Sequence, residues 1–279
     1  MTLMAADPDE SGSLPLVQAL RARRPQRTYR IIDAHAHAGP YSLFFIPRNS
    51  AGEMVDVMDR CGVRTAIVST NLGIQLDAAA GNRQTAGIVD AYPGRMYGYI
   101  VINPWQDPEA EIARWQDDPR FVGIKIHPDL HHYRITDARY GAVWEFAERT
   151  GRPVLTHTWL GSEYDDLAQV AAVAQRHPLA QIIAGHAGVR REGVDDAIAL
   201  AREHPGVHLE ICGSHGHGAI IARMVDELGS SRVLYGSDFP FIDMRTSLGR
   251  VIFAGLSRSD TAMVLGGNII KLIPQLAGD

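Results

Sequence analysis

Cysteine is scarce in this sequence. Among 279 residues only Cys61 and Cys212 occur, and each has apolar neighbours along the chain. Two such thiols do not provide the disulfide framework that stabilises small secreted domains, so their number favours a reducing compartment. We therefore expect two unpaired thiols in a core.

Long hydrophobic runs and an excess of basic charge are also lacking. No stretch approaches the roughly 18 to 20 continuous apolar residues that a membrane-spanning helix needs. The first 13 residues show neither the basic head nor the apolar run of an export signal. The net charge of -5 argues against a general binder of phosphate backbones. These absences predict a cytoplasmic protein with a small-molecule substrate and without a nucleic-acid or membrane partner.

The sequence does contain a regular alternation of strand-like and helix-like segments. Hydrophobic residues make up 46% of the chain, and short runs rich in β-branched residues alternate with longer helical patterns from Tyr29 onward. Eight such runs are found, at residues 30–37, 65–70, 96–103, 121–128, 153–158, 181–188, 207–213 and 232–240. Gly or Pro ends the helical segments between them. This order predicts an α/β fold of the (β/α)8 TIM-barrel type, with a doubly wound open sheet as the alternative.

The domain organisation follows from the same pattern. Residues 30–279 form one predicted barrel domain. Residues 1–29 mix small, acidic, basic and proline residues without sustained apolar periodicity, which predicts a loosely ordered N-terminal arm. As an alternative, residues 14–23 of the arm could form a short amphipathic helix that packs on the barrel exterior or on a partner.

Polar residues collect at the predicted carboxyl ends of the strands, where barrel enzymes carry their active sites. Five histidines and one carboxylate share this position: His35 and His37 on the first strand, His127 on the fourth, His157 on the fifth, His186 on the sixth and Asp238 on the eighth. Residues two apart on a strand face the same side, so the imidazoles of His35 and His37 should lie together. Imidazole and carboxylate donors suit Zn, Fe, Co or Mn, with Zn as the default expectation.

The motifs DAHAH, GIKIHP, THT, AGHAG and YGSDFP at these strand ends resemble the amidohydrolase superfamily. The resemblance covers residues 30–275, includes GGNIIKL near the end of the chain, and is closest to the amidohydrolase-related (amidohydrolase 2) branch. That branch contains metal-dependent hydrolases and non-oxidative decarboxylases of aromatic or unsaturated carboxylic acids. The resemblance implies that His35, His37, His157 and Asp238 are metal ligands. It also implies that His186 acts as an acid or base, or beside the ligands.

Lys125 allows two interpretations of the metal content. Some members of the superfamily carboxylate a lysine on the fourth strand to bridge two ions. Here His127 occupies the strand end, which favours one divalent ion and a Lys125 that contacts a substrate carboxylate or a buried ion-pair partner. A binuclear site with carboxylated Lys125 is the alternative.

The loops supply further candidates for substrate binding. Besides Lys125 and His127, we expect Arg134 and Trp159 to line the pocket, Arg134 through bidentate contact with a carboxylate. His215 and His217 follow the seventh strand and could contact substrate or remain loop residues. The apolar segment at residues 39–47 predicts a lid or a homodimer contact.

Three functions are compatible with this set of residues. The first is a hydrolase, in which metal-activated water attacks an amide, ester or lactone of a small organic acid and Asp238 takes up the proton. The second is a non-oxidative decarboxylase or hydratase of an aromatic or unsaturated carboxylic acid at the same centre. The third is a barrel that binds metal or ligand without turnover, which a missing ligand would favour; here the proposed set is complete.

Overall fold

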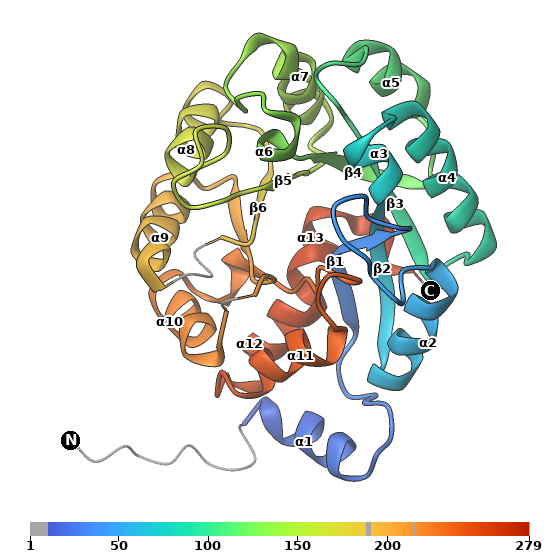
Figure 1. Ribbon diagram of the computed structural model, residues 1–279. Coiled ribbons are helices and arrows are strands. Elements are labelled where there is room, and N and C mark those ends of the chain that lie inside the picture. The colour runs from blue at the N-terminus through green and yellow to red at the C-terminus, as the bar shows by residue number, and fades with distance from the viewer. Residues whose placement is uncertain (1–10, 188–190, 215, 279) are drawn as a thin grey trace.

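Eight parallel strands alternate with helices in the computed structural model of the chain (Figure 1). The structure describes residues 11–187, 191–214 and 216–278. The strands are β1 (Ile31–Ala38), β2 (Val63–Thr70), β3 (Met96–Val101), β4 (Phe121–Ile126), β5 (Val154–His157), β6 (Ile182–Gly185), β7 (Val207–Glu210) and β8 (Val233–Leu234). Each strand pairs in parallel with the next one along the chain.

The sheet closes where the segment after β8 meets β1. Ala36 and Phe239 form a parallel bridge. The backbone N–H of Asp238 donates to the carbonyl oxygen of His35 at 2.8 Å, and the N–H of His37 donates to that of Phe239 at 2.6 Å. The strands therefore form a nearly closed barrel in a single domain, which confirms the predicted (β/α)8 architecture.

Helices surround the barrel on the outside (Figure 1). They are α2 (Ala51–Cys61), α3 (Asn71–Gln75), α4 (Ala78–Ala91), α5 (Pro108–Trp115), α6 (Pro128–His131), α7 (Gly141–Thr150), α8 (Leu167–Arg176), α9 (Val194–Glu203), α10 (Gly218–Leu228), α11 (Met244–Ile252), α12 (Arg258–Ala262) and α13 (Asn268–Leu272). The ends of α2 show how sequence sets these bounds. Ser50 and Glu53 form a capping box at its start, and Gly62, at φ 75°, takes the left-handed conformation at its end.

The barrel interior is divided into an apolar floor and a polar mouth. Alternate inward-facing residues of the strands pack together in the floor: Ile32, Ala34, Ile67, Tyr99, Val122, Leu155, Ile183 and Leu234. The Tyr99 hydroxyl donates to the carbonyl oxygen of Ala34 at 3.0 Å, so even this buried polar group is satisfied. The outward-facing residues pack against the helices in a larger cluster. Above this floor, the carboxyl ends of the strands form the polar mouth.

Several strands are shorter than the sequence pattern predicts at the end that carries the site. The sixth ends at Gly185 and the eighth at Leu234, against predicted ends at residues 188 and 240. Just beyond these ends, His186 (φ 62°) and Asp238 (φ 61°) take left-handed backbone conformations, which a strand does not accommodate. The strand pairing therefore ends before His186 and Asp238, and the backbone turns at these two residues.

The described part of the N-terminal arm lies against the outside of the barrel. Residues Ser13–Arg21 form helix α1 next to α11 (Figure 1), with Leu16 and Ala19 buried. The Tyr29 hydroxyl also donates to the carbonyl oxygen of Gly12 at 2.8 Å. Residues 1–10 of the predicted arm lie outside the described residues, and the division at residues 29 and 30 stays a prediction.

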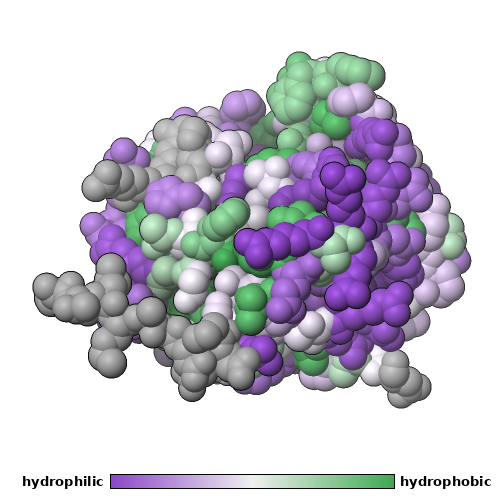
Figure 2. Space-filling view, turned by 90° about the horizontal axis from the view of Figure 1, so that it is seen from below, coloured by the Kyte–Doolittle hydropathy of each residue, from purple (hydrophilic) through white to green (hydrophobic). Residues whose placement is uncertain are grey.

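The face below the barrel in Figure 1 is seen directly in Figure 2. Hydrophilic side chains cover much of its right half, and apolar side chains are exposed between them in smaller groups. Among the described helices, none is both long enough and apolar enough to cross a membrane.

Candidate metal centre

Two strand ends bring three donor atoms together at the mouth of the barrel. His35 and His37 project from β1, and Asp238 follows β8. The Nε2 atom of His35 lies 3.1 Å from that of His37 and 3.8 Å from Oδ1 of Asp238, and His37 Nε2 lies 3.3 Å from the same oxygen. Ligands at about 2.0–2.2 Å from one ion are spaced by roughly 3.0–3.5 Å at the usual coordination angles. The spacing therefore fits shared coordination of a divalent ion.

Three histidines at the mouth have their Nδ1 atom held by a neighbouring side chain. The Nδ1 contacts are to Glu210 at 2.8 Å for His35, to Ser69 at 3.0 Å for His37 and to Asp165 at 2.9 Å for His157. An ionised carboxylate only accepts, so Glu210 and Asp165 favour the tautomers of His35 and His157 that leave the Nε2 lone pair for a metal. The Ser69 hydroxyl can accept from His37 in the same way. The donor set thus fits a divalent ion in chemistry as well as in spacing.

His127 and His157 look alike in sequence but differ in the structure. Their rings stack with centroids 3.9 Å apart and an interplanar angle of 12°. Nδ1 of His157 contacts the carboxylate of Asp165, whereas Nδ1 of His127 accepts a hydrogen bond from the backbone N–H of Leu130 at 3.2 Å. In a neutral His127 the proton is then on Nε2, so this ring offers a donor rather than a lone pair.

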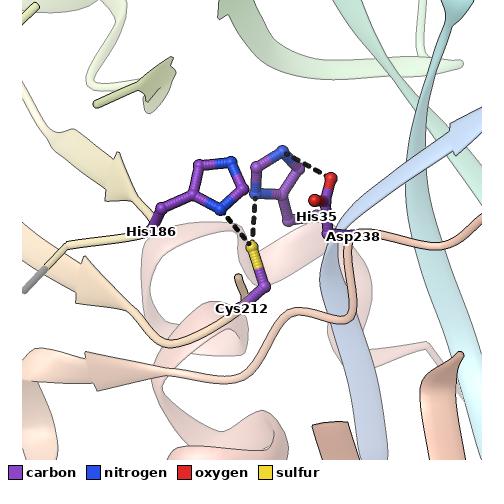
Figure 3. A group of neighbouring side chains, drawn as sticks. All are labelled: His35, His186, Cys212 and Asp238. Atoms are coloured by element: carbon purple, nitrogen blue, oxygen red, sulfur yellow. Dashed lines mark hydrogen bonds and ion pairs between the residues drawn. The ribbon is translucent and has the colours of Figure 1, made fainter. Parts of the chain in front are cut away.

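His186 and Cys212 lie on the other side of His35 from Asp238 (Figure 3). The Cys212 Sγ atom lies 3.2 Å from Nδ1 of His186 and 3.3 Å from Nδ1 of His35. These residues and Asp238 form a group of possible metal ligands, but the two nitrogens of one imidazole point apart. The sulfur therefore approaches His35 at Nδ1, whereas Asp238 approaches it at Nε2, the nitrogen that would bind an ion beside His37.

Burial and charge keep His35, His37 and His186 neutral. Burial, with Lys125 nearby, lowers the pKa of His35 well below its usual value, and burial lowers that of His186 to about 3. Burial would raise the pKa of Asp238, but the hydrogen bond with His37 and nearby positive charge hold it below the usual value. Neutral imidazoles and an ionised carboxylate are the forms that bind metal.

The carboxylate and the ammonium beside His35 are both fully buried. Burial raises the pKa of Glu210 to about 8, although hydrogen bonds from Cys212 oppose the shift. A cation at the opposite nitrogen of His35 would favour the ionised carboxylate. Burial lowers the pKa of Lys125 to about 8, and its Nζ atom lies 3.0 Å from His35 Nε2. Lys125 therefore borders the metal centre directly.

Two strained backbone positions hold functional side chains. His186 and Asp238 have φ values of 62° and 61°, a region that costs a residue with a side chain about 1–3 kcal/mol. Hydrogen bonds from the backbone of Asp238 to His35 and from that of His186 to the Glu210 carboxylate, at 3.4 Å, accompany this conformation. The strain is located where the chain turns both side chains into the mouth.

A cavity of about 470 Å³ opens over the donor atoms. Its walls combine aromatic, apolar and imidazole side chains, among them Tyr41, Phe44, Phe241, Trp159, Ile74, Leu130 and His127. Phe241 packs edge-on against the ring of His37, with centroids 5.5 Å apart. Of the described residues that line the cavity, Lys125 is the one Lys or Arg.

A larger hollow, about 960 Å³, lies at the opposite end of the strands. It is lined by residues 25–30, 62–64 and 93–95, together with Met58 and Asp59. None of these described residues belongs to the donor clusters. Size alone does not identify a catalytic site, and the converging donor atoms place the candidate centre in the smaller cavity.

The structure brings most of the predicted site residues to this cavity, but not all. His35, His37, Lys125, His127, His157, Trp159, His186 and Asp238 line it. Arg134, which we expected to bind a substrate carboxylate, is half-exposed and pairs with Glu163 at 3.3 Å. It does not line the cavity because its loop turns towards solvent. His217 is exposed at the start of α10, and His215 lies outside the described residues.

Sequence reasoning missed the side chains that hold the histidines. We assigned no role to Glu210 on the seventh strand, although its alternation with the apolar neighbours Leu209 and Ile211 is a signal for its place inside the barrel. Asp165 and Ser69 were not singled out. Asp165 lies in the loop after β5, where no periodicity applies, and only the folded chain shows that its carboxylate is buried against His157.

Comparison with known proteins identifies the family. The model of the amidohydrolase family matches residues 32–275. The chain belongs to the amidohydrolase family. This confirms the predicted relationship and an enzyme of the amidohydrolase superfamily with a metal-binding site. No curated protein matches this amidohydrolase in sequence.

Solved structures of low sequence identity share the fold of this amidohydrolase. The 2,6-dihydroxybenzoate decarboxylase from Rhizobium is 17% identical with a TM-score of 0.72, over 90% of this chain and 100% of that one. A dihydroxybenzoic acid decarboxylase from Polaromonas, solved with manganese and the inhibitor 2-nitroresorcinol, is 19% identical with a TM-score of 0.70, over 88% and 97%. A candidate 2-pyrone-4,6-dicarboxylic acid hydrolase from Pseudomonas putida is 18% identical with a TM-score of 0.64, over 89% and 99%.

Proposed function

We propose that this amidohydrolase is a non-oxidative decarboxylase of a small aromatic carboxylic acid that bears a hydroxyl beside its carboxylate. The cavity over the donor atoms carries the proposal. Aromatic rings from Tyr41, Phe44, Phe241 and Trp159 surround it, and Lys125 is the one Lys or Arg among its described lining residues. A planar ring with a single carboxylate matches aromatic walls and one cation beside the metal centre.

The sequence alone favoured a hydrolase, with decarboxylation as the alternative. Solved structures with the same fold include decarboxylases of dihydroxybenzoic acids, which supports the alternative. A substrate with two carboxylates, such as a pyrone dicarboxylate, calls for more than one cation, and Lys125 alone provides one. We therefore place decarboxylation first and hydrolysis second.

We assign the metal to His35, His37, His157 and Asp238. The orientation of His157 by Asp165 supports its place in this set, and the N–H that His127 presents argues against His127 as a ligand. When bound, a divalent ion polarises a substrate carboxylate and offsets its negative charge. Zn²⁺ and Mn²⁺ both suit imidazole and carboxylate donors, and Mn²⁺ is present in the Polaromonas relative.

The protein side chains then divide the remaining work. The Nε2–H of His127 and the ammonium of Lys125 hold the acid end of the substrate, and the aromatic walls keep its ring in the cavity. His186 accepts a hydrogen bond or a proton from the neighbouring hydroxyl. Asp238, which is ionised at rest, takes up a proton from water and passes it to the ring carbon while the carbon–carboxylate bond breaks, so carbon dioxide leaves and the electron pair of that bond forms the new C–H bond.

A substrate panel tests this proposal. Protein loaded with Mn²⁺ or Zn²⁺ is incubated with 2,6-dihydroxybenzoate, with benzoate as the acid that lacks the hydroxyl, and with 2-pyrone-4,6-dicarboxylate. We expect release of carbon dioxide from the hydroxylated acid and none from benzoate. Opening of the pyrone without release of carbon dioxide from any acid would establish the hydrolase instead.

Two variants show whether turnover comes from this cavity. Lys125→Met should abolish decarboxylation because it removes the cation beside the metal centre. Arg134→Met is the matched control, because Arg134 lies outside the cavity, and it should leave the rate within about twofold of the parent protein. Equal loss in both variants would contradict the assignment of Lys125 to the substrate.

A further inference from the structure

We propose that Cys212 is a positioning residue for His186: its thiol holds Nδ1 of His186, so that Nε2 of this ring faces the cavity as a proton acceptor. The proton-accepting role rests on the proposed decarboxylase, whereas the hydrogen-bond arrangement stands without it. Sequence analysis placed Cys212 only as a core thiol. The structure instead places it between His186 and the residues that support the metal centre (Figure 3).

The Cys212 side chain contacts the buried Glu210 and the partly buried His186. Its Sγ atom lies 2.8 Å from Oε2 of Glu210 and 3.2 Å from Nδ1 of His186. Its backbone N–H donates to Oε1 of the same Glu210 carboxylate at 2.6 Å. The Cys212 side chain is fully buried. Water therefore does not compete for these hydrogen bonds.

The proton positions follow from the number of donors and acceptors. A cation at the metal centre favours the ionised form of Glu210, and an ionised carboxylate only accepts. The thiol has one hydrogen, which it donates to Oε2 of Glu210. The sulfur can then only accept from His186, so a neutral His186 carries its proton on Nδ1. His35 likewise donates from Nδ1 to Glu210 at 2.8 Å, which leaves its Nε2 lone pair for the metal. One carboxylate thus sets the tautomers of both rings, the second of them through Cys212.

The geometry favours this role over metal ligation by the thiol. The sulfur is near the Nδ1 atoms of both histidines, whereas Asp238 and His37 approach His35 at Nε2. An ion held by His35 Nε2 and Asp238 therefore binds the ring nitrogen opposite to the one that the sulfur contacts. Serine at position 212 could make the same two hydrogen bonds with its hydroxyl, and alanine could make neither.

Nitrogen NMR of the histidine rings tests the hydrogen-bond arrangement directly. The full-length protein, labelled with ¹⁵N-histidine and loaded with diamagnetic Zn²⁺, is compared with Cys212→Ser, Cys212→Ala and the control Cys61→Ala, and signals are assigned with His186→Gln. We expect the Nδ1–H form of His186 in the parent, the serine variant and the control, and a gain of the Nε2–H form in Cys212→Ala. A parent His186 with its proton on Nε2, or an alanine variant identical to the parent, would overturn the proposal.

Kinetics with 2,6-dihydroxybenzoate tests the catalytic consequence. In Cys212→Ala we expect kcat to fall by about tenfold or more with KM within about threefold and metal content unchanged, because a misplaced base affects the proton transfer. Cys212→Ser should restore most of kcat. A loss of bound metal, or equal activity in all variants, would overturn the positioning role. If the parent does not convert the acid, the proposed substrate class fails, and the NMR result still decides the arrangement of Cys212 and His186.

Discussion

The buried carboxylate of Asp165 gives the sharpest test of the metal centre. It lies 2.9 Å from Nδ1 of His157 and is fully buried. Hydrogen bonds that involve a charged group contribute about 1.5–3 kcal/mol, and tenfold in an equilibrium constant corresponds to about 1.4 kcal/mol. Asp165→Ala should therefore weaken the affinity for Zn²⁺ by about 10- to 100-fold, in line with other carboxylates that orient metal-binding histidines.

The assay is competition with a chelating zinc indicator, together with thermal unfolding to confirm that each variant is folded. The neighbouring Asp166 provides the control, because its side chain caps α8 and does not contact His157. Asp166→Ala should lower stability by about 1 kcal/mol through loss of the cap and leave the affinity for Zn²⁺ unchanged. A folded Asp165→Ala protein that binds Zn²⁺ as tightly as the parent would refute the assignment of His157 as an oriented ligand.

Three further predictions address the proton, the packing and the pH dependence of this site. Asp238→Asn should reduce kcat by about 10²–10⁴-fold, measured with the substrate panel, while circular dichroism stays that of the parent; retained turnover would contradict the role of Asp238. Gly236→Ala should destabilise the protein by about 1–3 kcal/mol in urea unfolding, because the added Cβ would lie 2.7 Å from Cδ of Glu210 and 2.8 Å from Cβ of His35. Burial lowers the pKa of His131 to about 4 in the folded chain. The unfolded chain therefore binds more protons than the folded chain between pH 6.5 and 4. As the pH drops through this range, the free energy of unfolding falls by up to about 3 kcal/mol. The stability gap between the parent and His131→Gln should accordingly narrow from pH 7 to pH 4.5, and a constant gap would show that His131 does not contribute.

The fold could be predicted because its signals are local and repeated. Runs of β-branched residues marked each strand, and Gly or Pro marked each return, so eight βα units were countable. Strand ends were less predictable, since the last residues of β6 and β8 leave the ladder for backbone conformations that depend on the site. The π-helical segment Met263–Gly267 near the end of the chain also had no sequence signal that we recognised.

The candidate ligands at the strand ends could be predicted for a physical reason: alternation along a strand fixes which side chains face inward, and a parallel barrel gathers all strand ends at one mouth. His35 and His37 follow from these two rules, whereas Asp238 lies four residues beyond the last residue of β8 and reaches the mouth through its left-handed backbone conformation. Loop residues do not follow from these rules, because no periodicity fixes a loop. Arg134 was assigned to the cavity on its chemistry, yet its loop carries it to solvent, where it pairs with Glu163.

The sequence by itself determined the barrel, the histidine and aspartate positions at its mouth, and the resemblance to amidohydrolases. Only the tertiary structure decided which nitrogen of each histidine faces the cavity. That choice depends on partners far along the chain, such as Glu210 for His35, 175 residues away, and on contacts such as the backbone N–H of Leu130 at His127. The packed neighbours of a histidine decide which of its nitrogens carries the proton. His157 and His127 have similar positions in the sequence, but in the folded chain His157 is a candidate metal ligand and His127 is a hydrogen-bond donor.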